Sequence, residues 1–181
     1  GILVCLPDGT ILSANRAALE VFGFDSEDEL KKTSVAERYL DLRDRQRLFT
    51  SFEAAGVARG FEVRMKRKDG TAFWASLNVI TQTAESGESQ HLALIEDITD
   101  RRKAETAMIE SEAKFRSLFE QSMDAIYIGT PEGKVTDVNQ AWLKLFGYAR
   151  EDLVDLNASA LYADPADREA FARLMFQTGF V

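Results

Sequence analysis

The sequence has little of what enzymes, metalloproteins and membrane proteins require. It contains one cysteine, Cys5, and one histidine, His91. A single cysteine excludes an internal disulfide and is typical of a reducing compartment. No apolar run approaches the roughly 18 residues of a membrane-spanning helix, so we predict no membrane insertion for this part of the chain. No phosphate-binding loop, nucleophile elbow, metal-ligand cluster or dinucleotide fingerprint occurs, and we therefore predict no catalytic residue, no metal site and no enzymatic activity.

The charge balance is acidic. The chain has 22 Lys and Arg against 30 Asp and Glu, a formal net charge of −8 and a pI near 4.8. Its densest basic runs, residues 64–68 and 101–103, alternate with apolar residues or lie among acids. Because phosphate contacts dominate nucleic-acid affinity, we predict no nucleic-acid partner. No signal peptide is visible, and Gly1 in place of an initiator methionine predicts a fragment of a longer protein, so upstream targeting or membrane segments stay open. We expect this segment to be cytoplasmic.

The chain contains one long internal repeat. Residues 6–24 return as residues 130–148, with Pro, Gly, Asn, Ala, Leu, Phe and Gly at matching positions. After a one-residue shift the second copy repeats four more residues of the first: Tyr39, Asp41, Asp44 and Arg45 correspond to Tyr162, Asp164, Asp167 and Arg168. Solenoid repeats have periods of roughly 20 to 50 residues, so this repeat predicts two copies of one domain. We expect a first domain over residues 1–99, a helical linker over residues 100–116 and the N-terminal part of a second copy over residues 117–181.

The first copy begins with the pattern of a β-hairpin and a short helix. Residues 2–6 and 10–14 are apolar runs on either side of Asp8-Gly9, a turn signal. Asn15 is in the position of a helix cap, and Gly23 is expected to end that helix.

The rest of the first copy predicts more helix and then strands. Residues 26–29 have a capping-box pattern, and residues 42–55 repeat apolar side chains at helical spacing. Residues 61–66, 71–83 and 90–97 have the pattern of three strands. These elements predict an α+β domain with a five-stranded antiparallel sheet and helices on one face.

Alternation along the three strands assigns side chains to the two faces of the sheet. The inner face is wholly apolar and, with two phenylalanines of the predicted helix, forms the expected lining of a ligand pocket: Phe49, Phe52, Phe61, Val63, Met65, Phe73, Ala75, Leu77, Ala93 and Ile95. The outer face carries Trp74, Ile80, Leu92 and Leu94. Such a face requires a cover, which would be a flanking helix or a second subunit. We expect a homodimer.

Three motifs follow one another in a characteristic order. They are the Asp8-Gly9 hairpin leading to Asn15, the turn at residues 68–70 before Phe73-Trp74, and residues 96–103 before the linker. Together they resemble a tandem of PAS domains, or sensory boxes, of a bacterial signalling protein. The resemblance implies a sensory or interaction module, found in histidine kinases of two-component systems and in diguanylate cyclases, with any ligand between the inner sheet face and the helices. It also implies signal relay through the last three residues of the first domain, just before the linker: Asp97, Ile98 and Thr99.

The cofactors of such relatives do not suit this sequence. Haem-binding relatives place the iron ligand on the helix that corresponds to residues 42–55, which has no histidine, and His91 is expected at the surface of a strand end. Flavin photoreceptors carry a reactive cysteine just after the Asn15 position, where this chain has residues 16–19 without one. Flavin-holding amides are replaced by Met65, Ala75 and Ile95, and Cys5 is expected to be a small buried apolar residue. We predict no haem and no flavin, and leave open a small apolar ligand.

The linker and the second copy raise two further expectations. Helix is predicted from residue 101 to 121, capped by Thr99 or Asp100, with a heptad seam of Ala104, Met108, Ser111, Phe115 and Leu118. The seam suits a weak coiled coil or a rigid spacer, and both stay open.

The second copy lacks the counterparts of residues 59–99, so we expect several apolar side chains to be exposed unless something covers them: Ile126, Trp142, Leu145, Phe146 and Phe171.

The function predicted is therefore that of a non-enzymatic sensory and relay segment. In the first version, the first domain senses a small ligand and passes its occupancy through the linker helix to an output domain outside this sequence. In the alternative, the copies are constitutive dimerisation or protein-interaction modules with filled cores.

Overall fold

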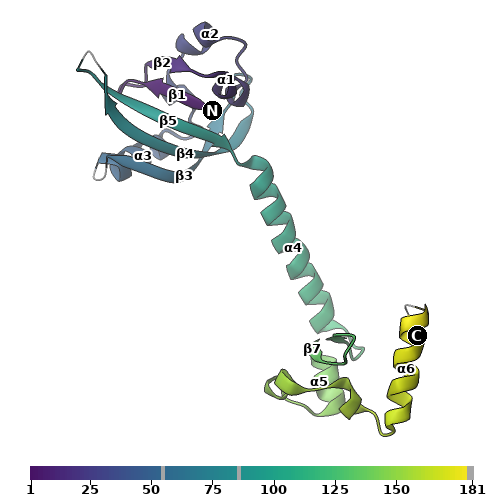
Figure 1. The fold of residues 1–181 in the computed structure, drawn as a ribbon. Helices are drawn as coiled ribbons and strands as arrows, with labels where there is room; N and C mark the ends of the chain where they lie inside the picture. Colours follow the sequence, from purple (N-terminus) through teal and green to yellow (C-terminus); the bar gives the residue numbers. More distant parts are fainter. Residues whose placement is uncertain (54–55, 85–86, 179–181) are drawn as a thin grey trace. The chain divides into compact units, whose positions relative to one another are not determined.

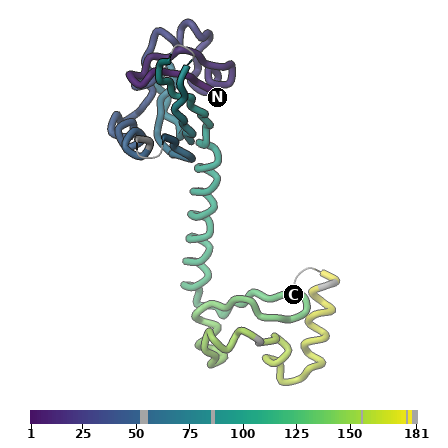
Figure 2. Tube along the Cα trace, turned by 60° about the vertical axis from the view of Figure 1, so that its left-hand side comes forward, coloured from purple at the N-terminus to yellow at the C-terminus, as the bar shows by residue number. Residues whose placement is uncertain are grey.

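The computed structural model describes residues 1–53, 56–84 and 87–178, without the side chains of Phe52, Glu53, Asp155 and Phe176. The chain forms two compact units, Gly1–Ala107 and Met108–Val181, and one long helix continues from the first into the second (Figures 1 and 2). Each unit is described by itself. In the described ranges, no helix is long and apolar enough to cross a membrane.

The first unit is a five-stranded antiparallel sheet with helices on one face (Figure 1). Its strands are β1 (Ile2–Cys5), β2 (Ile11–Ala14), β3 (Val57–Lys66), β4 (Ala72–Thr83) and β5 (Ser89–Asp97). The spatial order is β2-β1-β5-β4-β3, so the last strand lies in the centre beside the first. The helices between β2 and β3 are α1 (Arg16–Phe22), α2 (Glu27–Lys31), the 3-10 helix η1 (Val35–Arg38) and α3 (Leu42–Glu53). This confirms the predicted fold class.

Local hydrogen bonds explain the hairpin and the first helix. Asp8 accepts the amide of Thr10 at 2.8 Å, and Gly9 has a φ of 100°, which suits glycine. Asn15 Oδ1 accepts the amide of Ala18 at 2.9 Å and so caps α1, as predicted. The same oxygen accepts the amide of Ile2 at 2.9 Å. Asn15 therefore also fixes the start of the first strand against the helix.

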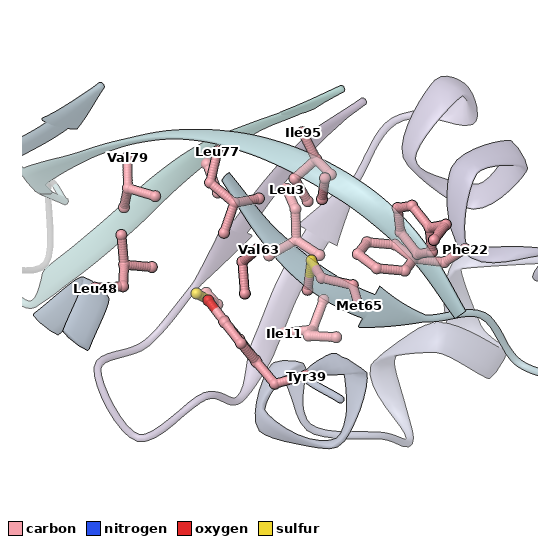
Figure 3. Close-up of a cluster of buried hydrophobic side chains, with 14 of the residues drawn as sticks. Leu3, Ile11, Phe22, Tyr39, Leu48, Val63, Met65, Leu77, Val79 and Ile95 are labelled. Carbon is pink, nitrogen blue, oxygen red and sulfur yellow. The ribbon is translucent and has the colours of Figure 1, made fainter. Parts of the chain in front are cut away.

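The inner face of the sheet is the core of this unit (Figure 3). Phe61 of the predicted inner face is half-buried. Seven other predicted inner-face residues are buried: Val63, Met65, Phe73, Ala75, Leu77, Ala93 and Ile95. Phe22 from α1 and Leu48 from α3 pack against them. The alternation argument is therefore confirmed for the core.

The outer face is partly covered by the following helix, α4 (Thr99–Gln121). The guanidinium of Arg102 lies 4.1 Å from the ring centroid of Trp74, which is half-buried. Leu92 is half-buried, whereas Ile80 and Leu94 are 43% and 50% exposed. The flanking helix therefore covers the tryptophan and leaves the aliphatic part of this face exposed.

The predicted cap of α4 is wrong. The helix begins at Thr99, whose amide donates to Asp97 Oδ1 at 2.9 Å. The hydroxyl oxygen of Thr99 accepts the amide of Trp74 at 2.9 Å. Because the Thr99 hydroxyl accepts from β4, the side chain that caps α4 is the carboxylate of Asp97 at the end of β5.

The second unit has a two-stranded sheet and its own small core. Its elements are β6 (Tyr127–Gly129), β7 (Val135–Val138), α5 (Gln140–Phe146), the 3-10 helices η2 (Arg150–Asp155) and η3 (Ala158–Leu161), and α6 (Pro165–Thr178). Trp142 was expected to be exposed, and this is wrong: it is 1% exposed, packed in a cluster with the hairpin and with the ring of Tyr148 5.6 Å away. Leu145 and Phe146 are exposed as expected, whereas Ile126 and Phe171 are partly buried.

Candidate functional site

The candidate site is a cavity between the inner sheet face and α3 in the first unit. Five predicted pocket residues line it: Phe49, Met65, Leu77, Ala93 and Ile95. Eight further lining residues were not in the predicted pocket, although alternation with Ala75 and Leu77 places Val79 on the inner face: Cys5, Leu6, Val35, Tyr39, Arg45, Leu48, Val79 and His91. Phe61, Val63, Phe73 and Ala75 lie in the core outside the lining. The side chain of Phe52 lies outside the described residues.

The cavity is small. The space open to the centre of a water molecule is about 40 Å³. One water needs roughly 10–15 Å³ on this measure, so the space holds a few waters or a ligand of a few non-hydrogen atoms. Drug-sized ligands need pockets of roughly 300–1,000 Å³, far more than this free space.

His91 is a lining residue and not the surface residue expected from the sequence. It is 7% exposed, and it is paired with Cys5 of β1 and Thr81 of β4. Its ring meets the ring of Phe49 edge-on, with centroids 5.7 Å apart. Burial, with a smaller contribution from the charge of Arg45, lowers the pKa of His91. The imidazole is therefore neutral at pH 7. The overlooked signal was its alternation with Ala93 and Ile95, which places all three on the inner face.

Four polar side chains border the apolar lining: Cys5, Tyr39, Arg45 and His91. We call them the polar cluster. Cys5 is buried as predicted, and burial raises the pKa of its thiol to about 11. Burial also raises the pKa of Tyr39. The hydroxyl end of Tyr39 points to the space between Leu48 and Val63 (Figure 3). At neutral pH these groups are a thiol, a phenol and a neutral imidazole, which can hydrogen-bond, beside one fixed positive charge.

The predicted relay residues lie where β5 passes into α4. Ile98 is buried, and its amide donates to the carbonyl of Trp74 at 2.9 Å. The carboxylate of Asp97 accepts hydrogen bonds from the amide of Thr99 and from the guanidinium of Arg67. Burial opposes ionisation of Asp97, but the hydrogen bonds from Thr99 and Arg67 outweigh it and lower the pKa of this carboxyl. The start of α4 is therefore held by an ionised carboxylate.

Arg67 extends these contacts to the first helix. Its guanidinium donates to the carbonyl of Val21 as well as to Asp97, and it lies 4.5 Å from the ring centroid of Phe73. Arg67 therefore contacts the end of α1, a core residue of β4 and the carboxylate at the start of α4.

Among the described residues, no group of His, Cys, Asp and Glu side chains could hold a metal ion.

Comparison with known proteins identifies the family. A family model described as PAS domain matches residues 1–100, and a second PAS domain model matches residues 113–176. The chain belongs to the PAS domain family, as the motifs predicted. PAS domains are sensory and non-catalytic modules.

Two curated relatives are sporulation kinases of Bacillus subtilis. Sporulation kinase E is 29% identical over 149 residues, which are 81% of this chain and 19% of that protein. Sporulation kinase A is 28% identical over 159 residues, 82% of this chain and 25% of that protein. This chain thus spans about a fifth to a quarter of their lengths. The crystal structure of a PAS domain of an HTR-like protein from Haloarcula marismortui is 30% identical, with a TM-score of 0.45 over 54% of this chain and 79% of that chain.

Proposed function

We propose that this chain is a non-enzymatic sensory segment of a multidomain, cytoplasmic bacterial signalling protein. The two sporulation kinases support an output domain of the histidine kinase type, and a diguanylate cyclase is the other candidate. In this proposal the output domain lies outside the present sequence, as the kinases extend well beyond the part that this chain matches.

Within this segment, the first PAS domain senses a small ligand and relays its presence to α4. The observation that carries the proposal is that cavity and relay share strand β5. His91, Ala93 and Ile95 line the cavity, and Asp97 ends the same strand. A ligand that shifts β5 therefore changes the hydrogen bonds that hold the first turn of α4.

A second candidate function is constitutive dimerisation or protein interaction without a ligand. The small free space in the cavity supports it, because a largely filled core needs no ligand for stability. The exposed aliphatic side chains on the outer face, Ile2, Ile80 and Leu94, support it as well. In that version the outer face is the homodimer interface of the first unit. The exposed apolar side chains of α4 in the second unit, Met108 and Leu118, form a coiled coil with a second copy.

Two neighbouring residues of β5 separate these functions. Ala93 points into the cavity, and Leu94 points to the outer face. Ala93→Val fills free space, so ligand sensing predicts that it abolishes binding and leaves self-association unchanged. Leu94→Lys should weaken self-association and leave ligand binding unchanged.

The measurements are native mass spectrometry of the purified chain, a thermal-shift screen of small metabolites, and sedimentation velocity. A ligand-dependent shift in the parent that Ala93→Val lacks supports sensing. No bound species and no shift across a broad library would overturn it and leave dimerisation as the function.

A further inference from the structure

The charge in the wall of the cavity indicates what the ligand is. Within the described part of the chain, Arg45 is the lining residue with a fixed charge. One of its nitrogens, Nη2, donates to the carbonyl of Pro7 at 3.1 Å, and its guanidinium lies 4.7 Å from the ring centroid of Phe49. Among described residues, no carboxylate oxygen forms an ion pair with it within 4.0 Å, and its buried Nε–H has no hydrogen-bond acceptor.

The second copy helps to separate the structural part of this side chain from the rest. Arg168 is the repeat counterpart of Arg45. A Cβ placed on Gly9 would lie 3.4 Å from Arg45 Nη2, and one on Gly133 would lie 3.3 Å from Arg168 Nη2. Both arginines therefore rest against the glycine of their hairpin. Packing against the hairpin accounts for Nη2 in both copies, but it does not account for a positive charge in the wall of an apolar cavity.

The buried Nε lies out of reach of a water-sized sphere, so a ligand in the cavity contacts the part of the Arg45 side chain that lines it. The charge of Asp8 acts on Arg45 from beyond ion-pair distance. An arginine with no carboxylate in direct contact favours an anion over a neutral molecule, and planar oxyanions match its donors. The neutral His91 and the phenol of Tyr39 line the same cavity and add hydrogen-bonding capacity. The free space restricts the ligand to a few non-hydrogen atoms.

Resting on the proposed sensing function, we infer that the ligand of the first PAS domain is a small oxyanion, such as a short-chain carboxylate, bound by the Arg45 guanidinium. The apolar part of the ligand packs on the aliphatic lining, and its carboxylate lies against the Arg45 guanidinium. This differs from the small, largely apolar ligand that the sequence left open, because Arg45 was not recognised there as a lining residue.

The test uses the intact, isotope-labelled chain and nuclear magnetic resonance. Acetate and formate are the probes, acetamide is the neutral control of the same size as acetate, and chloride keeps the ionic strength constant. The expected result is a saturable shift of the Arg45 Nε–Hε signal with acetate or formate, together with shifts of the His91 and Ala93 backbone amides. Acetamide should leave the Nε–Hε signal unchanged.

Two substitutions on α3 provide the matched comparison. Arg45→Gln should weaken acetate binding about 10- to 100-fold, the scale of one lost hydrogen bond to a charged group. Arg43→Gln, two residues away and with an 84% exposed side chain, should leave it unchanged. Arg45→Lys keeps the charge without the Nε donor and should retain only part of the affinity. If Arg45→Gln does not fold, the shift of the Arg45 Nε–Hε signal on adding acetate to the unsubstituted chain still tests whether the oxyanion binds at Arg45.

The outcomes for this inference and for the sensing proposal are distinct. Equal binding of acetate and acetamide, an unshifted Arg45 signal, or full affinity in Arg45→Gln overturns the oxyanion and leaves sensing intact if any ligand enters the cavity. Failure of both acetate and formate to bind also overturns it. Failure of every ligand in a broad library overturns the sensing proposal itself.

Discussion

Substitution of Asp97 tests the relay contacts most directly. Its carboxylate binds the first amide of α4 and the guanidinium of Arg67, and the two side chains of that ion pair are 27% and 28% exposed. Asp97→Asn keeps an oxygen that can accept from Thr99 but removes the charge. Asp97→Ala removes both contacts. The two variants therefore separate the charge from the cap.

The expected magnitudes follow from these contacts. A hydrogen bond to a charged group contributes about 1.5–3 kcal/mol, so Asp97→Asn should destabilise the first unit by about 1–2 kcal/mol after allowance for partial exposure. Loss of a helix cap adds about 1 kcal/mol, so Asp97→Ala should cost about 2–3 kcal/mol. Asp100→Asn is the control, because Asp100 lies in the same turn with a fully exposed side chain. It should change the stability by less than about 0.5 kcal/mol.

Two assays are needed. Urea denaturation measures the free energy of unfolding of each variant, and hydrogen exchange in the folded state measures the opening of the amides of residues 99–102. We expect faster exchange in both Asp97 variants and no change in Asp100→Asn. A double-mutant cycle with Arg67→Met should show a cost smaller than the sum of the single substitutions. Equal destabilisation by Asp97→Ala and Asp100→Asn, or strict additivity with Arg67→Met, would refute the relay contact.

Acidification should act in the same direction as these substitutions. The pKa of Asp97 is lowered in the folded state from its ordinary 3.8. The ionised carboxylate therefore contributes stability that is fully present above the unfolded pKa and is lost as pH falls through the lower folded pKa. The stability difference between the parent and Asp97→Asn should be constant above about pH 5 and shrink below pH 4. A difference that grows on acidification would contradict the assignment.

Four further substitutions, in two pairs, test other parts of the fold. Trp142→Ala should cost about 3–5 kcal/mol and unfold the second unit, whereas Leu145→Ala, at a 68% exposed position, should be nearly neutral by circular dichroism. Gly9→Ala should destabilise the first unit more than Gly70→Ala in thermal denaturation. Both glycines have positive φ, but the new Cβ at Gly9 would lie 2.7 Å from Ser34 Oγ. At Gly70, among the described residues other than its two chain neighbours, no atom is within 4 Å. Equal effects within either pair would contradict the packing described here.

Much of the first domain was predictable because its signals are local. Alternation along three strands identified the inner face, and Asn15 identified the start of α1. These patterns depend on neighbours in sequence, where the period of a strand or the geometry of a cap applies directly. The family was predictable for a related reason, since the order of such short motifs is itself a feature of sequence.

The composition of the candidate site depended on the tertiary structure. Cys5 and His91 become neighbours through strand pairing between β1 and β5, and Arg45 and Tyr39 reach them from the helical segment. Trp142 is buried by Val135 and Val138, which local pattern alone could not pair with it. Sequence alone determined the sheet, its apolar face and the two copies. Only tertiary structure decided which polar groups enter that face, because strand register and helix placement are set by non-local packing.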